Sequence, residues 1–330
     1  MGKQETRFLK AIADGLGIEI DDSLGSGGPG RSYRKGISMS ELLQIFPDDE
    51  AARAWFESAM WPNGPVCPKC SLGDNVRPST HKSMPYRCAD CRRHFSVKIG
   101  TVMERSKLGY QKWALTIYQI VTNVKGISSM KIHRNLGIRQ PAAWFMLHRL
   151  REAISSLARP GAMEGPAEVD EMYVGGKEKN KHADKKGNIK KVAVVGARDR
   201  KTGQVTAKPV PETTAARLCD FIEKHVEPNA MKYTDENRSY AGLEHHETVN
   251  HGNGEYVRGD VHTNGIESFW ALFRRGYYGT YHYMSPKHLH RYVDEFAGRL
   301  NTRFRDTIDM MKVVVKNAVG KRLTYSRLVN

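Results

Sequence analysis

Two closely spaced cysteine pairs constrain the fold of this chain more than any other feature of its sequence. Each pair is a C-x-x-C knuckle that can bring two thiolates to one metal ion, and two knuckles complete a tetrahedral site with no open position. The pairs are separated by 17 residues, which fits the spacing of a zinc ribbon. A redox dithiol would instead be a single pair beside a βαβ pattern. We therefore expect a small domain that needs structural Zn²⁺ to fold, with the ligands Cys67, Cys70, Cys88 and Cys91.

The charge of the chain indicates a polyanionic partner. Its 52 Lys and Arg residues exceed its 36 Asp and Glu residues, which gives 52 − 36 = +16. Nucleic acid is the usual partner of such a chain. No apolar run approaches the roughly 18 to 20 residues that a membrane span needs, so we expect no membrane association. Without a secretory signal, and with too few cysteines for a disulfide scaffold, the chain is expected in the reducing cytoplasm, associated with the nucleoid of a bacterium.

Helical periodicity follows the cysteine region. Apolar residues recur with helical spacing over 110–121, a second helix is expected from Ser128 to about Asn135, and a third begins near Gln140. The glycine-containing turn at 136–138 is typical of a helix-turn-helix. Beside its apolar face, the third helix carries the polar and cationic side chains that a recognition helix needs in a major groove, namely His148, Arg149 and Arg151. The same pattern also fits a three-helix bundle with a solvated basic face.

Acidic residues at predicted strands follow a break rich in proline and glycine at 159–166, which marks a domain boundary. Asp170 lies in a β-rich stretch, and Asp235 follows a short strand. A hairpin and a helix are expected between them, over 190–226. Single acids at strand ends are more often structural than catalytic, so the hypothesis of an active site depends on what lies farther along the chain.

A later helix supplies a third acid. Glu267 lies three residues after Asn264 and seven before Arg274, so the three side chains share one helical face. The order of strand-borne Asp, hairpin, helix, strand-ending Asp and helix-borne Glu is that of an RNase H-like nuclease core. Two Asp and a third oxygen ligand can hold two Mg²⁺ or Mn²⁺ ions, one for the attacking water or 3′-hydroxyl and one for the leaving oxygen. The neighbouring cations Arg274 and Arg275 are expected to contact DNA phosphates.

A basic run lies beside the first acid. Residues 177–191 read KEKNKHADKKGNIKK, which includes Lys179 and Lys181. Such a run is either a solvated loop or a segment that grips the DNA backbone, and we expect these two lysines to bind DNA.

These motifs together resemble those of bacterial insertion-sequence transposases of the DDE type, in the group with an N-terminal zinc ribbon and helix-turn-helix. The resemblance extends from roughly Ser38 to Arg305 and includes, in order, WPNGPVCPKC, EVDEMYVGGKEKNKH, YTDE and HTNGIESFWALFRRG. It implies that Asp170 and Asp235 are the first two catalytic acids. The third position varies in this group between Glu and Asn. The E-x6-[KR] spacing favours Glu267, which leaves Asn264 as a supporting ligand or phosphate contact, or as the third ligand itself.

The expected fold class is therefore multidomain α+β, with a zinc ribbon and a helical helix-turn-helix domain before an RNase H-like α/β catalytic domain. The expected parts are a flexible segment at 1–37, a helix and zinc ribbon at 38–105, a helix-turn-helix region at 106–158, the catalytic domain at 166–310 and a tail at 311–330.

The expected function is DNA transposition. The enzyme would cleave DNA at the transposon ends and join the freed 3′-hydroxyl to target DNA, with double-stranded terminal repeats and target DNA as partners and a homo-oligomer formed on DNA. One alternative is a non-catalytic DNA-binding regulator derived from a transposase, and another is an RNase H-like nuclease. Divalent-ion-dependent nicking separates the first alternative from the enzyme, and strand transfer separates the second.

Overall fold

The computed structural model describes residues 34–175, 191–249, 255 and 257–330, and these fall into two compact units. The first unit joins the chain up to Thr122 with residues 304–330, and the second spans 123–303. Within the described residues, no helix combines the length and apolar character that crossing a bilayer requires. The predicted flexible segment at 1–37 lies almost wholly outside the described residues.

Short helices with side-chain caps begin the first unit. Helix α2 (Met39–Ile45) starts with a capping box, in which Ser38 and Glu41 each accept a hydrogen bond from the other's backbone N–H. Helix α3 (Asp49–Met60) starts after Asp48, whose carboxylate accepts hydrogen bonds from two backbone N–H groups of the first turn. Its buried residues, Ala52, Trp55, Phe56 and Ala59, recur with helical spacing and form one apolar face.

The C-terminal residues of the chain complete this first unit. Helix α10 (Thr307–Lys316) packs on α3 and on α4 (Tyr110–Thr122), and the short helix α11 (Tyr325–Val329) follows it. We expected residues 311–330 to be a tail, but the structure places them in the same compact unit as the ribbon. The physical reason is the apolar face of α10, where Met311, Val314 and Val315 are buried.

A small antiparallel sheet forms the ribbon. Its strands are β1 (Val76–Pro78), β2 (Tyr86–Cys88) and β3 (His94–Phe95), in that order. One face carries the few apolar side chains, among them the buried Phe95 packed between Trp61 and Tyr86. So small an apolar cluster is too little to hold three strands of two or three residues without a metal ion.

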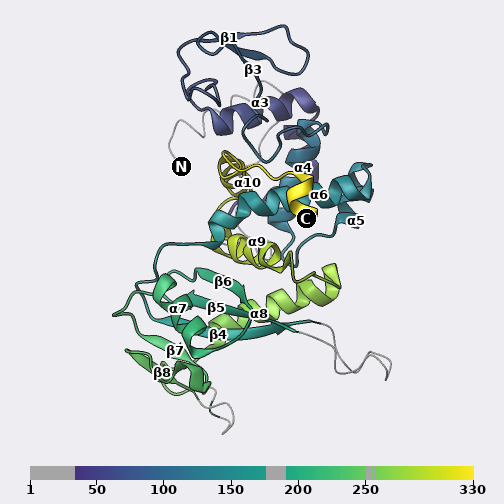
Figure 1. The fold of residues 1–330 in the computed structure, drawn as a ribbon. Coiled ribbons are helices and arrows are strands. Elements are labelled where there is room, and N and C mark those ends of the chain that lie inside the picture. Colours follow the sequence, from purple (N-terminus) through teal and green to yellow (C-terminus); the bar gives the residue numbers. More distant parts are fainter. Residues whose placement is uncertain (1–33, 176–190, 250–254, 256) are drawn as a thin grey trace. The chain divides into compact units, whose positions relative to one another are not determined.

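A five-stranded mixed sheet lies at the centre of the second unit, between its helices (Figure 1). The strand order is β6-β5-β4-β7-β8, and the strands are β4 (Ala167–Val174), β5 (Val192–Asp199), β6 (Val205–Val210), β7 (Lys232–Thr234) and β8 (His246–Thr248). The first three strands along the chain are antiparallel neighbours, whereas β7 and β8 run parallel to β4. This mixed order is consistent with an RNase H-like domain.

Helices cover both faces of this sheet. Helix α7 (Ala215–His225) packs on one face, over alternate residues such as Val169 and Val195. Helices α8 (Asn264–Gly276) and α9 (Leu289–Thr302) pack on the other, over Met172 and Val194. Because successive strand residues point to opposite faces, the even-numbered residues of β4 lie on the side of α8 and the odd-numbered ones on the side of α7.

Helices α5 (Ser129–Leu136) and α6 (Gln140–Ile154) also belong to the second unit. They pack on each other across a turn at Gly137, whose backbone is left-handed, and α6 packs on α9. The 3-10 turn η2 (Ser155–Ala158) then leads toward the sheet, and the π-helical turn η7 (Tyr277–Tyr281) follows α8. The first helix of the predicted helix-turn-helix, α4, lies in the first unit.

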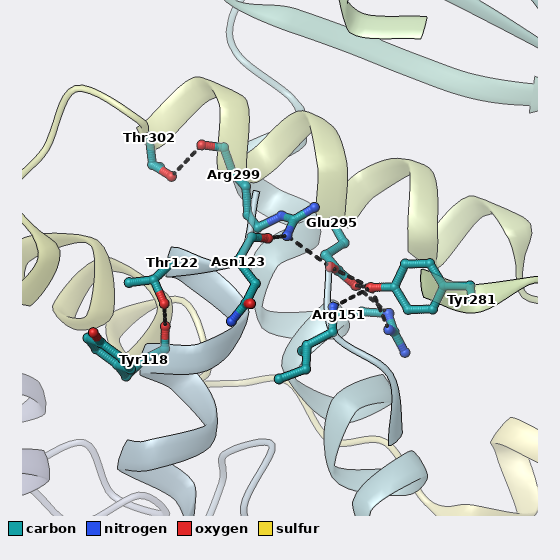
Figure 2. A network of polar contacts seen from close by, with 9 residues as sticks. Tyr118, Thr122, Asn123, Arg151, Tyr281, Glu295, Arg299 and Thr302 are labelled. Carbon is teal, nitrogen blue, oxygen red and sulfur yellow. Dashed lines mark hydrogen bonds and ion pairs between the residues drawn. The ribbon is translucent and has the colours of Figure 1, made fainter. Parts of the chain in front are cut away.

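A buried polar network joins α6, η7 and α9 (Figure 2). Arg151 Nε donates to Glu295 Oε2 at 2.7 Å, and Tyr281 donates its hydroxyl to the same carboxylate at 3.0 Å. Arg299 Nη1 lies 3.5 Å from Glu295 and also donates to the carbonyl of Asn123. A pair of opposite charges removed from water needs such additional hydrogen bonds to be tolerated.

This packing corrects the expected DNA-binding face of the third helix. We expected His148, Arg149 and Arg151 to be presented to DNA, but all three are buried. The cause is that α5, α9 and η2 all pack on α6. The spacing of apolar residues along the helix could not show that the face with these cations is also buried. Arg151 is the internal partner of Glu295.

Candidate functional site

The four predicted zinc ligands converge in the ribbon. Their sulfur atoms all lie within 4.8 Å of one another, and Cys67 Sγ and Cys91 Sγ are 3.6 Å apart. A tetrahedral site with Zn–S distances of about 2.3 Å requires sulfur atoms about 3.8 Å apart. The four thiols therefore fit one Zn²⁺ and leave no ligand position for a substrate.

A second cluster of ligand atoms lies in the sheet of the second unit. Oxygen atoms of Asp170, Glu171 and Asp235 all lie within 4.8 Å of one another. Asp170 lies within β4, and Asp235 directly follows β7. Because β4 and β7 are parallel neighbours, two acids separated by 64 residues in the chain meet at this part of the sheet.

Hydrogen bonds fix the orientation of these carboxylates. Asp170 Oδ1 accepts from the backbone N–H of Glu171 at 2.8 Å, and Asp235 Oδ1 accepts from that of Asn237 at 3.1 Å. The amide of Asn237 donates to Glu171 Oε1 at 3.1 Å, so the segment that follows β7 also holds the acid next to Asp170. Each carboxylate keeps acceptor capacity for a hard cation, which prefers oxygen ligands.

Burial makes this cluster a place where negative charge is costly without a cation. It raises the pKa of Asp170 to about 6, with the charges of Asp235 and Glu267 acting in the same direction. Burial likewise raises the pKa of Glu171 to about 7, and the charges of Asp235 and Asp170 add to this. A divalent ion would reverse this balance by favouring the ionised carboxylates.

The two candidates for the third ligand lie at the start of α8. Asn264 is the first residue of the helix and is exposed, whereas Glu267 is half-buried. Glu267 Oε1 accepts a hydrogen bond from Thr263 Oγ1 at 2.7 Å. Glu267 is near enough for its charge to raise the pKa of Asp170, but its carboxylate is not part of the compact three-residue cluster.

A buried acid fastens this helix to the sheet. Glu168 lies two residues before Asp170 on the same face of β4 and is almost fully buried. Its carboxylate accepts from the backbone N–H of Ile266, in the first turn of α8, at 2.8 Å, and from Arg200 Nε at 2.9 Å. Arg200 also donates to the carbonyl of His262 at 2.6 Å. The start of α8 is thereby held at a fixed distance from the strand that carries Asp170.

Two glycines allow this close approach. A Cβ at Gly265 would lie 2.6 Å from Glu168 Oε2, and one at Gly196 would lie 2.7 Å from the ring of Trp270. Gly196 is the register partner of Asp170 on β5. Glycine at these two positions lets α8 lie directly on the sheet beside the acidic cluster.

The remaining predicted DNA contacts divide into two groups. Arg274 and Arg275 are exposed in the last turn of α8, and their contact with DNA stays a prediction. Lys179 and Lys181 lie outside the described residues.

Sequence reasoning missed Glu168 and Glu171 as parts of the site. Both are in the motif EVDEMYVGG, where acidic residues at three of four consecutive positions in a β-rich stretch were a usable signal. Alternation places Glu168 on the same face of the strand as Asp170, which made it a candidate for the site, whereas its burial and its partners follow only from the packing of α8.

Comparison with known proteins gives two domain matches. Residues 47–94 match a transposase zinc-ribbon domain, and residues 162–301 match an ISXO2-like transposase domain. The second match contains Asp170, Asp235 and both candidates for the third ligand.

Two curated relatives are similar to the chain. An uncharacterized protein in transposable element ISH50 of Halobacterium salinarum is 27% identical over 296 residues, which cover 84% of this chain and 99% of that protein. An uncharacterized transposase-like protein of Haemophilus influenzae is 28% identical over 115 residues, 33% of this chain and 92% of that protein. Since one of these relatives is archaeal, the similarity does not assign a bacterial source.

Proposed function

Because the chain belongs to the ISXO2-like DDE transposases with a zinc ribbon, we propose that it cleaves DNA at the ends of an insertion sequence and joins the freed 3′-hydroxyl to target DNA. The observation that carries this proposal is that Asp170, on β4, lies close to Asp235, which directly follows the parallel neighbour β7, inside the matched transposase domain.

The acidic cluster would hold divalent metal ions. Asp170 and Asp235 are the proposed ligands, Glu267 is favoured as the third, and Glu171 offers a further oxygen. Mg²⁺ or Mn²⁺ bound there would activate the attacking oxygen and stabilise the leaving oxygen of an in-line displacement. The role of Glu168 and Arg200 is to keep the start of α8, and with it Glu267, beside the cluster.

Double-stranded DNA is the proposed partner, both as terminal repeats and as target. Arg274 lies two turns after Glu267 on α8, which suits contact with a phosphate of the strand in the active site. We infer that α5 and α6 are the two helices of the predicted helix-turn-helix. The exposed cations there are on α5 and in the turn, at Lys131, Arg134 and Arg139, so we assign DNA contact to these in place of the buried residues of α6. We infer that copies of the chain assemble on DNA to bring two ends together.

The test is metal-dependent cleavage and strand transfer on DNA that carries the terminal repeats of the element. Asp170→Ala or Asp235→Ala removes a charged ligand and should abolish both steps in Mg²⁺ and Mn²⁺ while end binding persists. Asp→Asn at either position should fail almost as badly, because a neutral amide cannot balance the charge of the ions. Normal strand transfer by either alanine variant would refute the mechanism.

The third ligand is decided by a matched set of variants on α8. If Glu267 is the ligand, Glu267→Ala should be as inactive as the aspartate variants and Asn264→Ala should keep partial activity. Ser268→Ala, at an exposed position of the same helical turn, serves as the control. The reverse pattern would assign the role to Asn264. DNA binding without metal-dependent cleavage by the native sequence would indicate a regulator, and cleavage without strand transfer would indicate a nuclease.

A further inference from the structure

The outer face of the ribbon sheet carries basic side chains in a single row. Arg77 on β1 is the register partner of Arg87 on β2, and Arg87 is the register partner of His94 on β3. Register partners on antiparallel strands point to the same side of the sheet, with Cβ atoms about 5 Å apart. All three side chains are exposed. We call these three residues the basic row.

The basic row is unfavourable for the fold of the ribbon itself. Like charges directly opposite each other on neighbouring strands destabilise a sheet. Within the described part of the chain, neither arginine forms an ion pair with a carboxylate. The domain is also small, so it has little other stabilisation to offset this repulsion. A benefit outside the folding of the ribbon is therefore needed to explain two unpaired arginines at facing positions.

Neutralising the metal site does not explain this charge. Four thiolates around Zn²⁺ carry a net negative charge, and nearby cations would reduce it. However, Cys88 and its register partner Val76 point to the opposite face of the sheet from Arg87, because successive strand residues alternate. The inner face holds the thiols and apolar groups, whereas the basic row faces outward.

The chemistry of the row fits phosphate groups. Arginine presents a planar fork of donors that matches phosphate geometry, often through two hydrogen bonds. At His94, Nδ1 is hydrogen-bonded to Ser79 Oγ at 2.9 Å, so Nε2 is the nitrogen that a phosphate oxygen can approach. A row across three strands extends about 10 Å, which matches a partner with regularly repeated negative charges better than one bound anion.

We propose that the basic row is a binding surface for the phosphate backbone of double-stranded DNA. This inference rests on the proposed function for the choice of DNA as the polyanion. It adds to that function a contact made by the zinc ribbon, which is separate from the acidic cluster. Because the row contacts phosphates and not base edges, it should bind without regard to sequence and thereby strengthen binding to end and target DNA alike.

The test measures how binding of the full-length, zinc-loaded chain to a DNA duplex depends on salt. The logarithm of the binding constant falls as the logarithm of the salt concentration rises, and each phosphate contact adds about 0.9 to the steepness of this fall. The double variant Arg77→Gln/Arg87→Gln should therefore make the slope less steep by about 1.8. The factor by which affinity falls between 50 and 200 mM salt should then be about tenfold smaller than for the native chain. Lys69→Gln/Lys107→Gln removes the same charge from exposed positions of the same unit outside the row and should change the slope much less.

A separate measurement shows whether the ribbon of the variant is folded. Removing the two arginines should weaken DNA binding, but it should not destabilise the ribbon, because it relieves the repulsion between them. The arginine double variant should keep one zinc ion per chain and unfold at the same or a higher temperature than the native chain. Weaker DNA binding together with zinc loss would mean that the arginines support folding, and this would overturn the proposal.

Other outcomes separate this proposal from the proposed function. An unchanged salt slope, or equal effects of the two double variants, overturns the basic row even if the native chain cleaves DNA. A lower slope in a chain that shows no metal-dependent cleavage supports the basic row and refutes the transposase mechanism. A native chain that does not bind duplex DNA overturns both.

Discussion

Glu168→Gln tests whether the start of α8 is fastened to the sheet by a single buried carboxylate. The substitution keeps the shape of the side chain but turns one acceptor oxygen into a donor NH₂ group. Both carboxylate oxygens face donors, namely Ile266 N at 2.8 Å and Arg200 Nε at 2.9 Å. Whichever way the amide is oriented, one donor meets another donor, so one charge-assisted hydrogen bond must be lost.

The expected loss of stability is that of one hydrogen bond to a charged group, which contributes about 1.5–3 kcal/mol. Arg200 still donates to the carbonyls of Asp260 and His262, so the free energy of unfolding should not fall by more than this. For a unit the size of residues 123–303, each kcal/mol lowers the melting temperature by about 2–4 °C. The variant should therefore melt about 3–12 °C below the native chain.

The assay is scanning calorimetry combined with single-turnover cleavage well below the melting temperature. Because α8 carries Glu267, a small displacement of its first turn should lower the cleavage rate; a misplacement of about 1 Å can cost about 100-fold. Glu223→Gln, the same change at an exposed position of α7, is the control. Native melting temperature and native cleavage in Glu168→Gln would refute the positioning role. A lower melting temperature with native cleavage would restrict the role to stability.

Three further predictions concern metal, pH and the buried network. Cys88→Ser should reduce zinc below one ion per chain, by metal analysis, and unfold the ribbon, whereas a zinc-free chain with a folded ribbon would contradict the assignment. Burial, reinforced by the charge of Arg151, lowers the pKa of His148 to about 2. As pH falls below about 6.5, the imidazole of His148 therefore takes up a proton in the unfolded chain but not in the folded one. Denaturant titrations should show the free energy of unfolding falling by about 1.4 kcal/mol per pH unit from this group, so that it falls more steeply than in His148→Leu. Glu295→Met should destabilise by about 3–5 kcal/mol, because it leaves Arg151 buried without its acid. Arg151→Met should lower the free energy of unfolding by less than Glu295→Met does, because Tyr281 and Arg299 still contact Glu295. Equal destabilisation by the two variants would contradict the network in Figure 2.

Much of the site could be predicted because its signals are local or depend only on element order. The zinc ligands follow from two knuckles, each of which forms within four residues of chain. The pairing of Asp170 with Asp235 needed only the order of strands and helices, since neighbouring parallel strands place residues at equivalent register positions side by side. The resemblance to DDE transposases rested on these same motifs, and the domain matches confirm it.

Tertiary structure alone decided which polar side chains face inward. The period of α6 was visible in the sequence, but the second half of this helix is packed on several sides, so Arg151 became the buried partner of an acid 144 residues away. The packing of α10 with the N-terminal helices and the fastening of α8 by Glu168 likewise depend on which surfaces meet. Periodicity identifies an apolar stripe within one element, whereas the cost of burying a charge is set by the partners that other elements bring to it.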